Sequence, residues 1–562
     1  MTSPDAPAPP TLQRSPNGPF ILLGLGLLGV GIAAWRPVPA GVWHDDGVYM
    51  LVGKALSSGP GFVYDGVVGT PPAAKFPPLY PALLGLLWAV FGGIGPTTLI
   101  ATLLNLAMLA GAGGLFAWAL HASGALSLRK SLAAAGLGFA STDLLRTALV
   151  PLSESLFVLL GACAFAVWVV ATGPQRKGDG RTGGEGAPSD PTLGTRPLVS
   201  LGILLVACVA TRSAGLALAL AFTLALWTRA GLRAALLTTG PAIATVWLWG
   251  RWASAKSEQI PEGARDLLGP YGSWLLDQAL TAPGAFIGQL PAHVAGLASR
   301  VAAIFVPGLA GSLLWVAAVP LGVVAVLGIA RLLVRFPPLG WFALGYLAML
   351  VLWPYLDRRL IAPIHPVLVA AVAVGASELL ERAGPRTWGR LVGAAAVVWI
   401  AGYSVVSAFR IADGWPAAPY RLRAERLAAA VEAMERTVPE DGVVGAPEFW
   451  AALHLHGGWT VAPSVLFDPR SVDPDAPVWG TPDALVELWR TTGIEYLLLE
   501  QAGRMQGPAL DLIEDACPES VFVLAQMETA LLVKLEWSPA CEVIATATPP
   551  SMPRWRGRST PG

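Results

Sequence analysis

Runs of apolar residues separated by short polar segments extend from the N-terminal region to about position 410. A helix of about 20 apolar residues crosses a bilayer, so each run is a candidate membrane span, although several are short. Eleven runs are candidates: 20–35, 79–91, 98–120, 149–172, 198–211, 215–227, 234–250, 308–329, 339–354, 360–380 and 391–409. The pattern predicts a polytopic α-helical membrane protein with about 11–13 transmembrane helices. An odd number of spans would place the chain ends on opposite sides.

Basic residues orient these spans, because short cytoplasmic loops are enriched in lysine and arginine. When the spans alternate, four basic loops fall on one side, which we assign to the cytoplasm: 176–196, 229–233, 331–335 and 382–390. The segment 132–145 does not fit, since it is apolar but follows Arg129 and Lys130, which favour the cytoplasm. We interpret it as a re-entrant or partly buried helix. The expected location is the inner (cytoplasmic) membrane, with a cytoplasmic N-terminus.

The remaining segments are polar and lie between or beyond the spans. The tail 1–18 and the linker 173–197 are rich in proline, glycine or serine and are predicted to be disordered and cytoplasmic. The segments 37–77 and 251–300 are predicted extracytoplasmic loops, the second with short helices on the membrane surface. Together with the spans, these segments form a membrane domain over 19–410.

After residue 410 the composition becomes that of a soluble domain. A surface helix is predicted over 420–436, and short β-like runs lie at 442–446, 496–500, 520–527 and 530–537. The segment 411–545 is long enough for a small extracytoplasmic α/β domain with its own core. A disordered tail, 546–562, is expected after it.

Composition agrees with this class of protein. The charged fraction is 13%, about half of the roughly 25% typical of soluble chains, and the mean hydropathy is +0.58. The 37 basic and 37 acidic residues cancel, so nothing indicates a nucleic-acid partner. Cys517 and Cys541 flank the last two β-like runs. A hairpin there would bring them together and predicts a disulfide in an oxidising periplasm, with two free thiols as the alternative.

Charged residues gather in the loop between the first two runs, at 41–81. Asp45 and Asp46 follow the first run, and Tyr49 comes one helical turn later. Lys75 precedes a double proline at the start of the next helix. A carboxylate fixed there could act as a base, and a lysine could bind a lipid phosphate. A helix cap for Asp45 and an interfacial anchor for Lys75 are the simpler interpretations.

These motifs resemble a known family. The acidic pair, Tyr49, Leu-Ser-Ser-Gly at 56–59 and Lys-Phe-Pro-Pro-Leu-Tyr at 75–80 look like the first periplasmic loop of GT-C fold glycosyltransferases that use polyprenyl-phosphate sugars. These enzymes are the aminoarabinose transferases and the related protein O-mannosyltransferases. The helical layout extends the likeness over most of the first 410 residues. Segments 443–463 and 493–500 also resemble the small periplasmic domain of bacterial members.

The resemblance implies a reaction and its partners. Asp45 matches the catalytic carboxylate, Asp46 its acidic neighbour and Lys75 the lysine that holds the donor phosphate. A lipid, glycan or protein acceptor, deprotonated by Asp45, would attack the anomeric carbon of a polyprenyl-phosphate sugar with inversion. The reaction would take place on the outer face of the membrane, among membrane lipids. No cofactor is implied with certainty, and a divalent metal remains possible.

Further positions match the family outside the first loop. Glu154 stands where relatives have an acid at the outer end of a helix. Arg358 and Arg359 resemble a phosphate-binding arginine before a proline-punctuated helix, with ordinary interfacial arginines as the alternative. Two departures concern the sugar: Val48 stands where the aminoarabinose enzymes have an arginine, and Phe76 is inserted before the prolines. The resemblance therefore implies the reaction class and not aminoarabinose as substrate.

Two other classes of protein are compatible with a helical bundle. A transporter or flippase of a lipid-linked solute would need polar groups near the bilayer midplane, for which Asn105 and His365 are the best candidates. A structural scaffold would leave the charged loop unexplained. The glycosyltransferase is the function that accounts for the loop.

Overall fold

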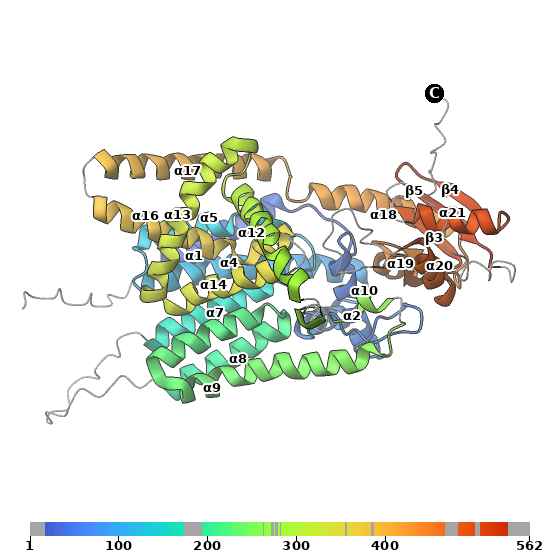
Figure 1. Ribbon diagram of the computed structural model, residues 1–562, viewed down its shortest axis with the longest axis horizontal. Coiled ribbons are helices and arrows are strands. Elements are labelled where there is room, and N and C mark those ends of the chain that lie inside the picture. The colour runs from blue at the N-terminus through green and yellow to red at the C-terminus, as the bar shows by residue number, and fades with distance from the viewer. Residues whose placement is uncertain are drawn as a thin grey trace, which may run out of the picture.

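The chain forms a helical bundle with a small α/β domain at one end (Figure 1). The computed structural model describes residues 17–172, 194–261, 264–270, 275, 279–281, 283–353, 357–383, 387–466, 481–500 and 506–537. The predicted disordered segments therefore lie largely outside the described residues, as does Cys541.

The bundle is built from helices that run roughly side by side and from shorter helices at the end nearest the α/β domain (Figure 1). Its helices are α1 (Gly18–Ala34), α2 (His44–Ser58), α3 (Leu79–Phe91), α4 (Ile94–Ala122), α5 (Leu128–Phe139), α6 (Thr142–Ala148), α7 (Glu154–Thr172), α8 (Thr195–Thr211), α9 (Gly215–Ser257), α10 (Arg265–Leu268), α12 (Pro283–Phe305), α13 (Gly311–Arg335), α14 (Pro337–Leu352), α15 (Arg358–Ile361), the 3₁₀ helix η2 (Ala362–Ile364), α16 (His365–Ala383) and α17 (Thr387–Ala412).

Six of the described helices are long and apolar enough to cross a membrane: α4, α7, α9, α13, the continuous segment Arg358–Ala383 and α17. Shorter apolar helices, α1, α3, α8 and α14, accompany them. Helix α9 is interrupted at Gly231, whose φ of 83° no helix accommodates, so it consists of two helices, as the runs 215–227 and 234–250 predict. The prediction of a polytopic helical membrane protein is confirmed.

The order of the first helices differs from the prediction. The ring of Phe20, near the start of α1, lies 6.1 Å from that of His121, near the end of α4. These two helix ends therefore lie at the same end of the bundle, whereas alternation of the runs 79–91 and 98–120 would separate them. Helix α3 has 13 residues, too few for a bilayer about 30 Å thick. The segment 132–145, predicted to be a re-entrant or partly buried helix, forms the partly buried helices α5 and α6, and Arg129 and Lys130 lie in the first turn of α5.

The described part of the segment 251–300 is mostly helical. Helix α9 continues to Ser257, α10 is a short helix of 4 residues as predicted, and α12 runs for 23 residues, longer than a short surface helix. Pro291 lies inside α12. Proline is tolerated in helices packed within apolar surroundings, where neighbouring groups compensate for its missing hydrogen bond.

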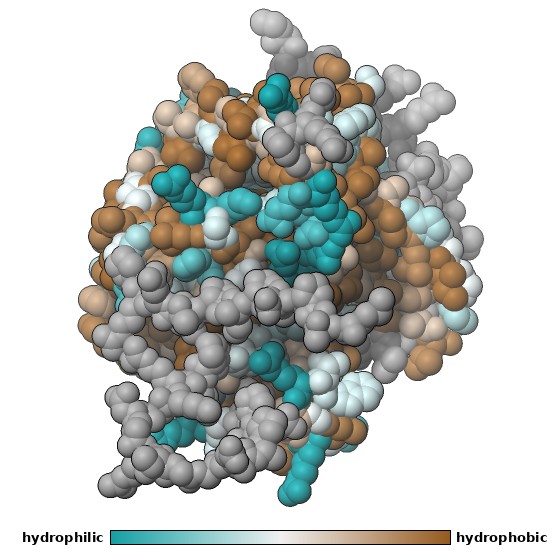
Figure 2. Space-filling model, turned by 90° about the vertical axis from the view of Figure 1, so that its left-hand side faces the viewer, coloured by the Kyte–Doolittle hydropathy of each residue, from teal (hydrophilic) through white to brown (hydrophobic). Residues whose placement is uncertain are grey.

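Arginines gather at the end of the bundle opposite the α/β domain. Glu378 on α16 pairs with Arg331 at 2.7 Å and Arg335 at 3.3 Å on α13, and with Arg382 at 3.0 Å on its own helix. Figure 2 looks onto this end and shows hydrophilic side chains enclosed by a hydrophobic rim. This arrangement suits the end we predict to face the cytoplasm.

The α/β domain contains one mixed sheet in the order β2-β1-β3-β5-β4. Strand β1 is parallel to β2 and β3, and β5 is antiparallel to β3 and β4. Its elements are α18 (Ala418–Thr437), β1 (Val443–Ala446), α19 (Trp450–Gly457), β2 (Thr460–Pro463), α20 (Pro482–Thr491), β3 (Tyr496–Glu500), α21 (Gly507–Ala516), β4 (Val521–Gln526) and β5 (Ala530–Leu535). The four predicted β-like runs each contain a strand, and β2 was missed.

The first loop of the bundle adds to this sheet. The Val461 N–H donates to the Gly66 carbonyl at 2.8 Å, and the Val68 N–H donates to the Val461 carbonyl at 3.0 Å. Helix α19 covers the start of α2 so closely that a Cβ on Gly41 would lie 2.4 Å from the Ala452 Cβ. Helix α2 is thus enclosed between the bundle and the domain (Figure 1).

Candidate active site

The turn that leads into α2 is fixed by Asp46. Its carboxylate accepts the N–H groups of Gly41 and Trp43, each at 2.8 Å, and its side chain is fully buried. Burial raises its pKa to about 7, although these hydrogen bonds oppose the rise. These hydrogen bonds hold the turn before α2. The predicted catalytic role of Asp46, beside Asp45 in the first turn of α2, stays a prediction.

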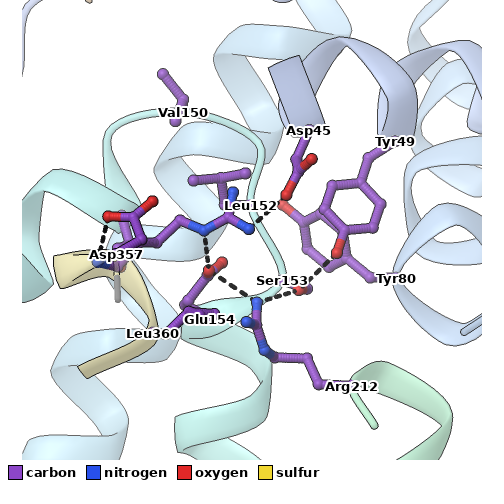
Figure 3. Close-up of polar contacts among 12 residues, drawn as sticks. Asp45, Tyr49, Tyr80, Val150, Leu152, Ser153, Glu154, Arg212, Asp357 and Leu360 are labelled. Atoms are coloured by element: carbon purple, nitrogen blue, oxygen red, sulfur yellow. Dashed lines mark hydrogen bonds and ion pairs between the residues drawn. The ribbon is translucent and has the colours of Figure 1, made fainter. Parts of the chain in front are cut away.

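Asp45 is the first member of a chain of buried charges (Figure 3). Its carboxylate forms an ion pair with Arg359 on α15. The Arg359 Nε lies 3.1 Å from Glu154 Oε1, and Arg212 Nη1 lies 2.7 Å from the same oxygen. The four side chains come from α2, α15, the start of α7 and the residue that ends α8. Segments far apart in the sequence therefore meet at one point.

A neutral scaffold surrounds these charges. The Tyr49 hydroxyl lies 3.1 Å from Ser153 Oγ, which also accepts from Arg212 at 3.0 Å (Figure 3). Asp45 and Tyr49 are four residues apart and share one face of α2. Asn105 on α4 donates to the Val150 carbonyl at 2.9 Å and so holds the segment before Glu154. The conspicuous Tyr49 of the sequence motif is thus a positioning group.

Lys75 supplies a third cation near Asp45. Its side chain is 7% exposed, and burial lowers its pKa to about 8, although the Asp45 carboxylate opposes the fall. For Asp45, burial would raise the pKa, but Arg359 and Lys75 together hold it well below the usual range. Two carboxylates, Asp45 and Glu154, therefore face three cations, Lys75, Arg212 and Arg359. Among these five side chains the cations outnumber the carboxylates by one, with the partly protonated Asp46 beside them.

The structure brings together most of the predicted residues. Asp45, Glu154 and Arg359 are in direct contact, and Lys75 lies within electrostatic range of Asp45. Arg358, also predicted to bind the donor phosphate, forms no ion pair with any described residue and faces Asp143 on α6. Cys517 is disulfide-bonded. Its pairing with Cys541 stays a prediction, since Cys541 lies outside the described residues.

Arg212 was missed in the sequence. It lies between the runs 198–211 and 215–227, on the side that we predict to be extracytoplasmic. A lone arginine there departs from the usual distribution of basic residues, and that departure was a signal of function.

A divalent metal was left open from the sequence. Within the described part of the chain, no three His, Cys, Asp or Glu side chains gather closely enough to hold an ion. Asp45 and Glu154 are the two carboxylates at the site, and Arg359 bridges them. These residues do not form a metal-ligand set.

The fold of this protein is the GT-C fold of polytopic membrane proteins. Among solved structures, ArnT from Cupriavidus metallidurans bound to undecaprenyl phosphate matches with a TM-score of 0.50 and 14% identity, over 92% of this chain and 97% of that one. An oligosaccharyltransferase from Archaeoglobus fulgidus, in complex with zinc and sulfate, matches with a TM-score of 0.52 and 12% identity, over 86% of this chain and 68% of that one. At these identities the likeness establishes the fold alone. No family model and no curated protein matches the sequence.

Proposed function

We propose that this protein is a membrane glycosyltransferase that moves a sugar from a polyprenyl-phosphate donor to a lipid, glycan or protein acceptor. One observation carries the proposal: Lys75, Arg212 and Arg359 converge in a buried site with only two carboxylates that are fully ionised, Asp45 and Glu154. A buried site of this charge suits an anion, because a phosphate completes the balance. The structurally similar ArnT binds undecaprenyl phosphate, which supports a lipid-linked phosphate as ligand.

Lys75 and Arg359 are the residues we assign to the donor phosphate. Both lie close to Asp45, so a phosphate bound to them competes with this carboxylate for the same positive charge. As the cations turn to the phosphate, the pKa of Asp45 rises toward its ordinary value. The carboxylate then becomes a better acceptor for a proton. Donor binding would in this way prepare the base.

The reaction is a single displacement. Asp45 takes the proton from the acceptor hydroxyl or amine, whose oxygen or nitrogen forms a bond to the anomeric carbon. The bond from that carbon to the phosphate oxygen breaks, and its electron pair leaves with the polyprenyl phosphate. Lys75 and Arg359 stabilise the charge that develops on the leaving group. The configuration at the anomeric carbon is inverted, because the reaction has a single displacement step.

Glu154 bridges Arg359 and Arg212. Glu154 is fully buried and pairs with both guanidinium groups. A buried carboxylate beside two arginines fixes the position of each, and so orients Arg359 toward Asp45. Glu154 was predicted as a catalytic acid, and we propose that it positions Arg359.

The two residues that favoured a transporter, Asn105 and His365, form hydrogen bonds within the protein. Asn105 donates to the carbonyls of Val150 and Leu152, and His365 Nε2 lies 3.0 Å from the Tyr403 hydroxyl. These contacts hold elements together and give Asn105 and the Nε2 of His365 a structural role.

A transfer assay in oriented vesicles tests the proposal. Radiolabelled polyprenyl-phosphate sugars are supplied to inverted and right-side-out vesicles that contain the protein. A transferase gives labelled acceptor and free polyprenyl phosphate when the donor reaches the outer face. Movement of intact donor across the membrane without cleavage would show a flippase instead.

A further inference from the structure

A second group of cations lies outside the charge chain at Asp45. Arg146 on α6 and Arg410 at the end of α17 both stack on the ring of Trp415, with guanidinium carbons 5.2 Å and 4.8 Å from its centroid. Trp415 lies in the turn after α17, where the Trp415 N–H donates to the Arg410 carbonyl at 2.9 Å. One indole thus holds two guanidinium groups in place.

These arginines lack a carboxylate partner. Arg146, Arg358 and Arg410 form no ion pair within 4 Å in the described part of the chain, and the buried Nε of Arg146 has no hydrogen-bond partner there. The carboxylate that the three face is Asp143, which is 6% exposed, with Asp357 beyond it. Asp143 Oδ1 likewise has no hydrogen-bond partner among the described residues. Three guanidinium groups therefore face the Asp143 carboxylate without closing an ion pair among the described residues.

The surroundings of this group are apolar on one side. Phe409, next to Arg410, is 72% exposed, and Val405, one turn earlier on α17, is 52% exposed. Helix α17 is a candidate membrane span, so these side chains face lipid tails. Helix α17 ends at Ala412, two residues after Arg410, and leads to α18, where the chain leaves the bundle for the α/β domain (Figure 1). Cations directly beyond an apolar helix face suit a ligand with an anionic head and apolar tails.

We propose that Arg146 and Arg410, held on Trp415, bind the phosphate of an anionic membrane lipid at a site separate from Lys75 and Arg359. Guanidinium groups match phosphate oxygens with paired N–H donors, and stacking on one ring orients them before the ligand arrives. The lipid tails lie along the exposed face of α17.

Lipid retention tests this site directly, without any transfer reaction. The full chain is extracted from vesicles of phosphatidylcholine and phosphatidylglycerol, and bound phosphatidylglycerol is counted by native mass spectrometry. We expect the Arg146→Gln, Arg410→Gln double variant to retain this lipid at least about tenfold less, because charge-assisted contacts to phosphate are lost. Arg436→Gln is the matched control, since Arg436 is exposed on α18 and pairs with Glu432. The Arg146→Lys, Arg410→Lys variant keeps the charge and should keep part of the retention.

Two outcomes would overturn the proposal. Equal retention in the double Gln variant and the wild type, with only a lower melting temperature, would show that the arginines join α6 to α17 and bind no lipid. A titration with inorganic phosphate distinguishes a lipid from a free phosphate ion. If the protein binds inorganic phosphate as tightly as short-chain phosphatidylglycerol, the site does not recognise the lipid. Binding of undecaprenyl phosphate is measured alongside. If Lys75→Ala loses the binding of undecaprenyl phosphate and the double Gln variant keeps it, the two ligands have separate sites.

Discussion

Asp45 and Asp46 are adjacent in the sequence but have opposite surroundings. Asp46 is closed off by two backbone N–H groups, and its pKa is raised by burial. Asp45 faces Arg359 and Lys75, which lower its pKa and keep it charged. Neighbouring carboxylates with divergent environments can serve different tasks, one structural and one chemical.

The pair supports a first prediction. Asp45→Asn keeps the size of the side chain but cannot take a proton, so the transfer rate should fall at least about 100-fold. Asp46→Asn should cost less rate, since its amide still accepts one of the two N–H groups. It should lower stability instead, because the other N–H is left facing an amide donor, at about 1–3 kcal/mol. Transfer rate per folded protein and melting temperature separate these effects. Near-normal transfer by Asp45→Asn, or greater loss of rate in Asp46→Asn, would contradict the assignment.

Lys75 gives a second prediction, on pH. Its pKa of about 8 means that the ammonium is present below this pH and is lost above it. Donor KM should therefore rise as the pH passes about 8. Lys75→Arg should keep its charge and abolish this rise, because arginine stays protonated, whereas Lys75→Ala should bind donor weakly at every pH. A wild-type KM that stays constant from pH 7 to 10 would return Lys75 to the role of an interfacial anchor.

At the scale of elements, helices α13 and α16 show how small residues set the packing. A Cβ on Gly328 would lie 1.7 Å from the Ala371 carbonyl oxygen, and one on Gly375 would lie 2.0 Å from that of Val324. The two helices touch through their backbones at these points, as small residues permit in membrane bundles.

The third prediction follows from this contact. Gly328→Ala and Gly375→Ala should each destabilise the bundle, because overpacking costs about 1–3 kcal/mol. Gly322→Ala, on the same helix as Gly328, meets no atom within 4 Å and should be neutral or slightly stabilising. Melting temperatures in detergent compare the three variants. A similar melting temperature for Gly328→Ala and Gly322→Ala would show that the helices separate easily.

Element boundaries show what the sequence could and could not predict. Long apolar runs such as α7 and α13 were located by hydrophobicity alone. Helix α3 was taken as a span because it is apolar, but its 13 residues are too few. The segment of α5 and α6 was interpreted as a re-entrant or partly buried helix, because Arg129 and Lys130 before it did not fit the alternation of spans. Strand β2 has four residues and ends in a proline, and it is completed by Gly66 and Val68 from a distant loop. Such pairings leave no local pattern.

The residues of the candidate site also differ in whether the sequence could predict them. Asp45, Lys75 and Glu154 were found by motif resemblance, but the choice of Arg359 over Arg358 depends on where α15 packs. Arg359 enters the site, and its neighbour turns to α6. Arg212 belongs to no motif, and only its unusual position in the charge pattern pointed to it.

At the scale of the whole molecule, the α/β domain is part of the candidate active site. Lys54 Nζ on α2 lies 2.9 Å from His454 Nε2 on α19, and His456 Nε2 lies 2.9 Å from the Ala40 carbonyl oxygen. The turn that positions Asp45 is therefore enclosed by residues of the domain. A bundle alone would leave that turn exposed.

The fourth prediction uses two glycines of this loop. Gly41 and Gly59 both have positive φ, of 89° and 115°, but only Gly41 faces α19. Alanine at either position should cost roughly 1–2 kcal/mol of backbone strain. Gly41→Ala should in addition push α19 away from α2 and lower the transfer rate. Gly59→Ala should leave the transfer rate unchanged. Rates and melting temperatures of both variants test this, and equal rates would show that the domain does not position the loop.

The contact between Lys54 and His454 joins residues 400 positions apart. A ribosome that adds about 5–20 residues per second needs roughly 20–80 s to cover that distance. During this interval the first loop has left the membrane without the strand and helix that later enclose it. The protein would be unable to use its donor until the last domain has been exported and has folded. A chain truncated before that domain would then be inserted in the membrane but inert, and a complete chain would acquire activity in one late step.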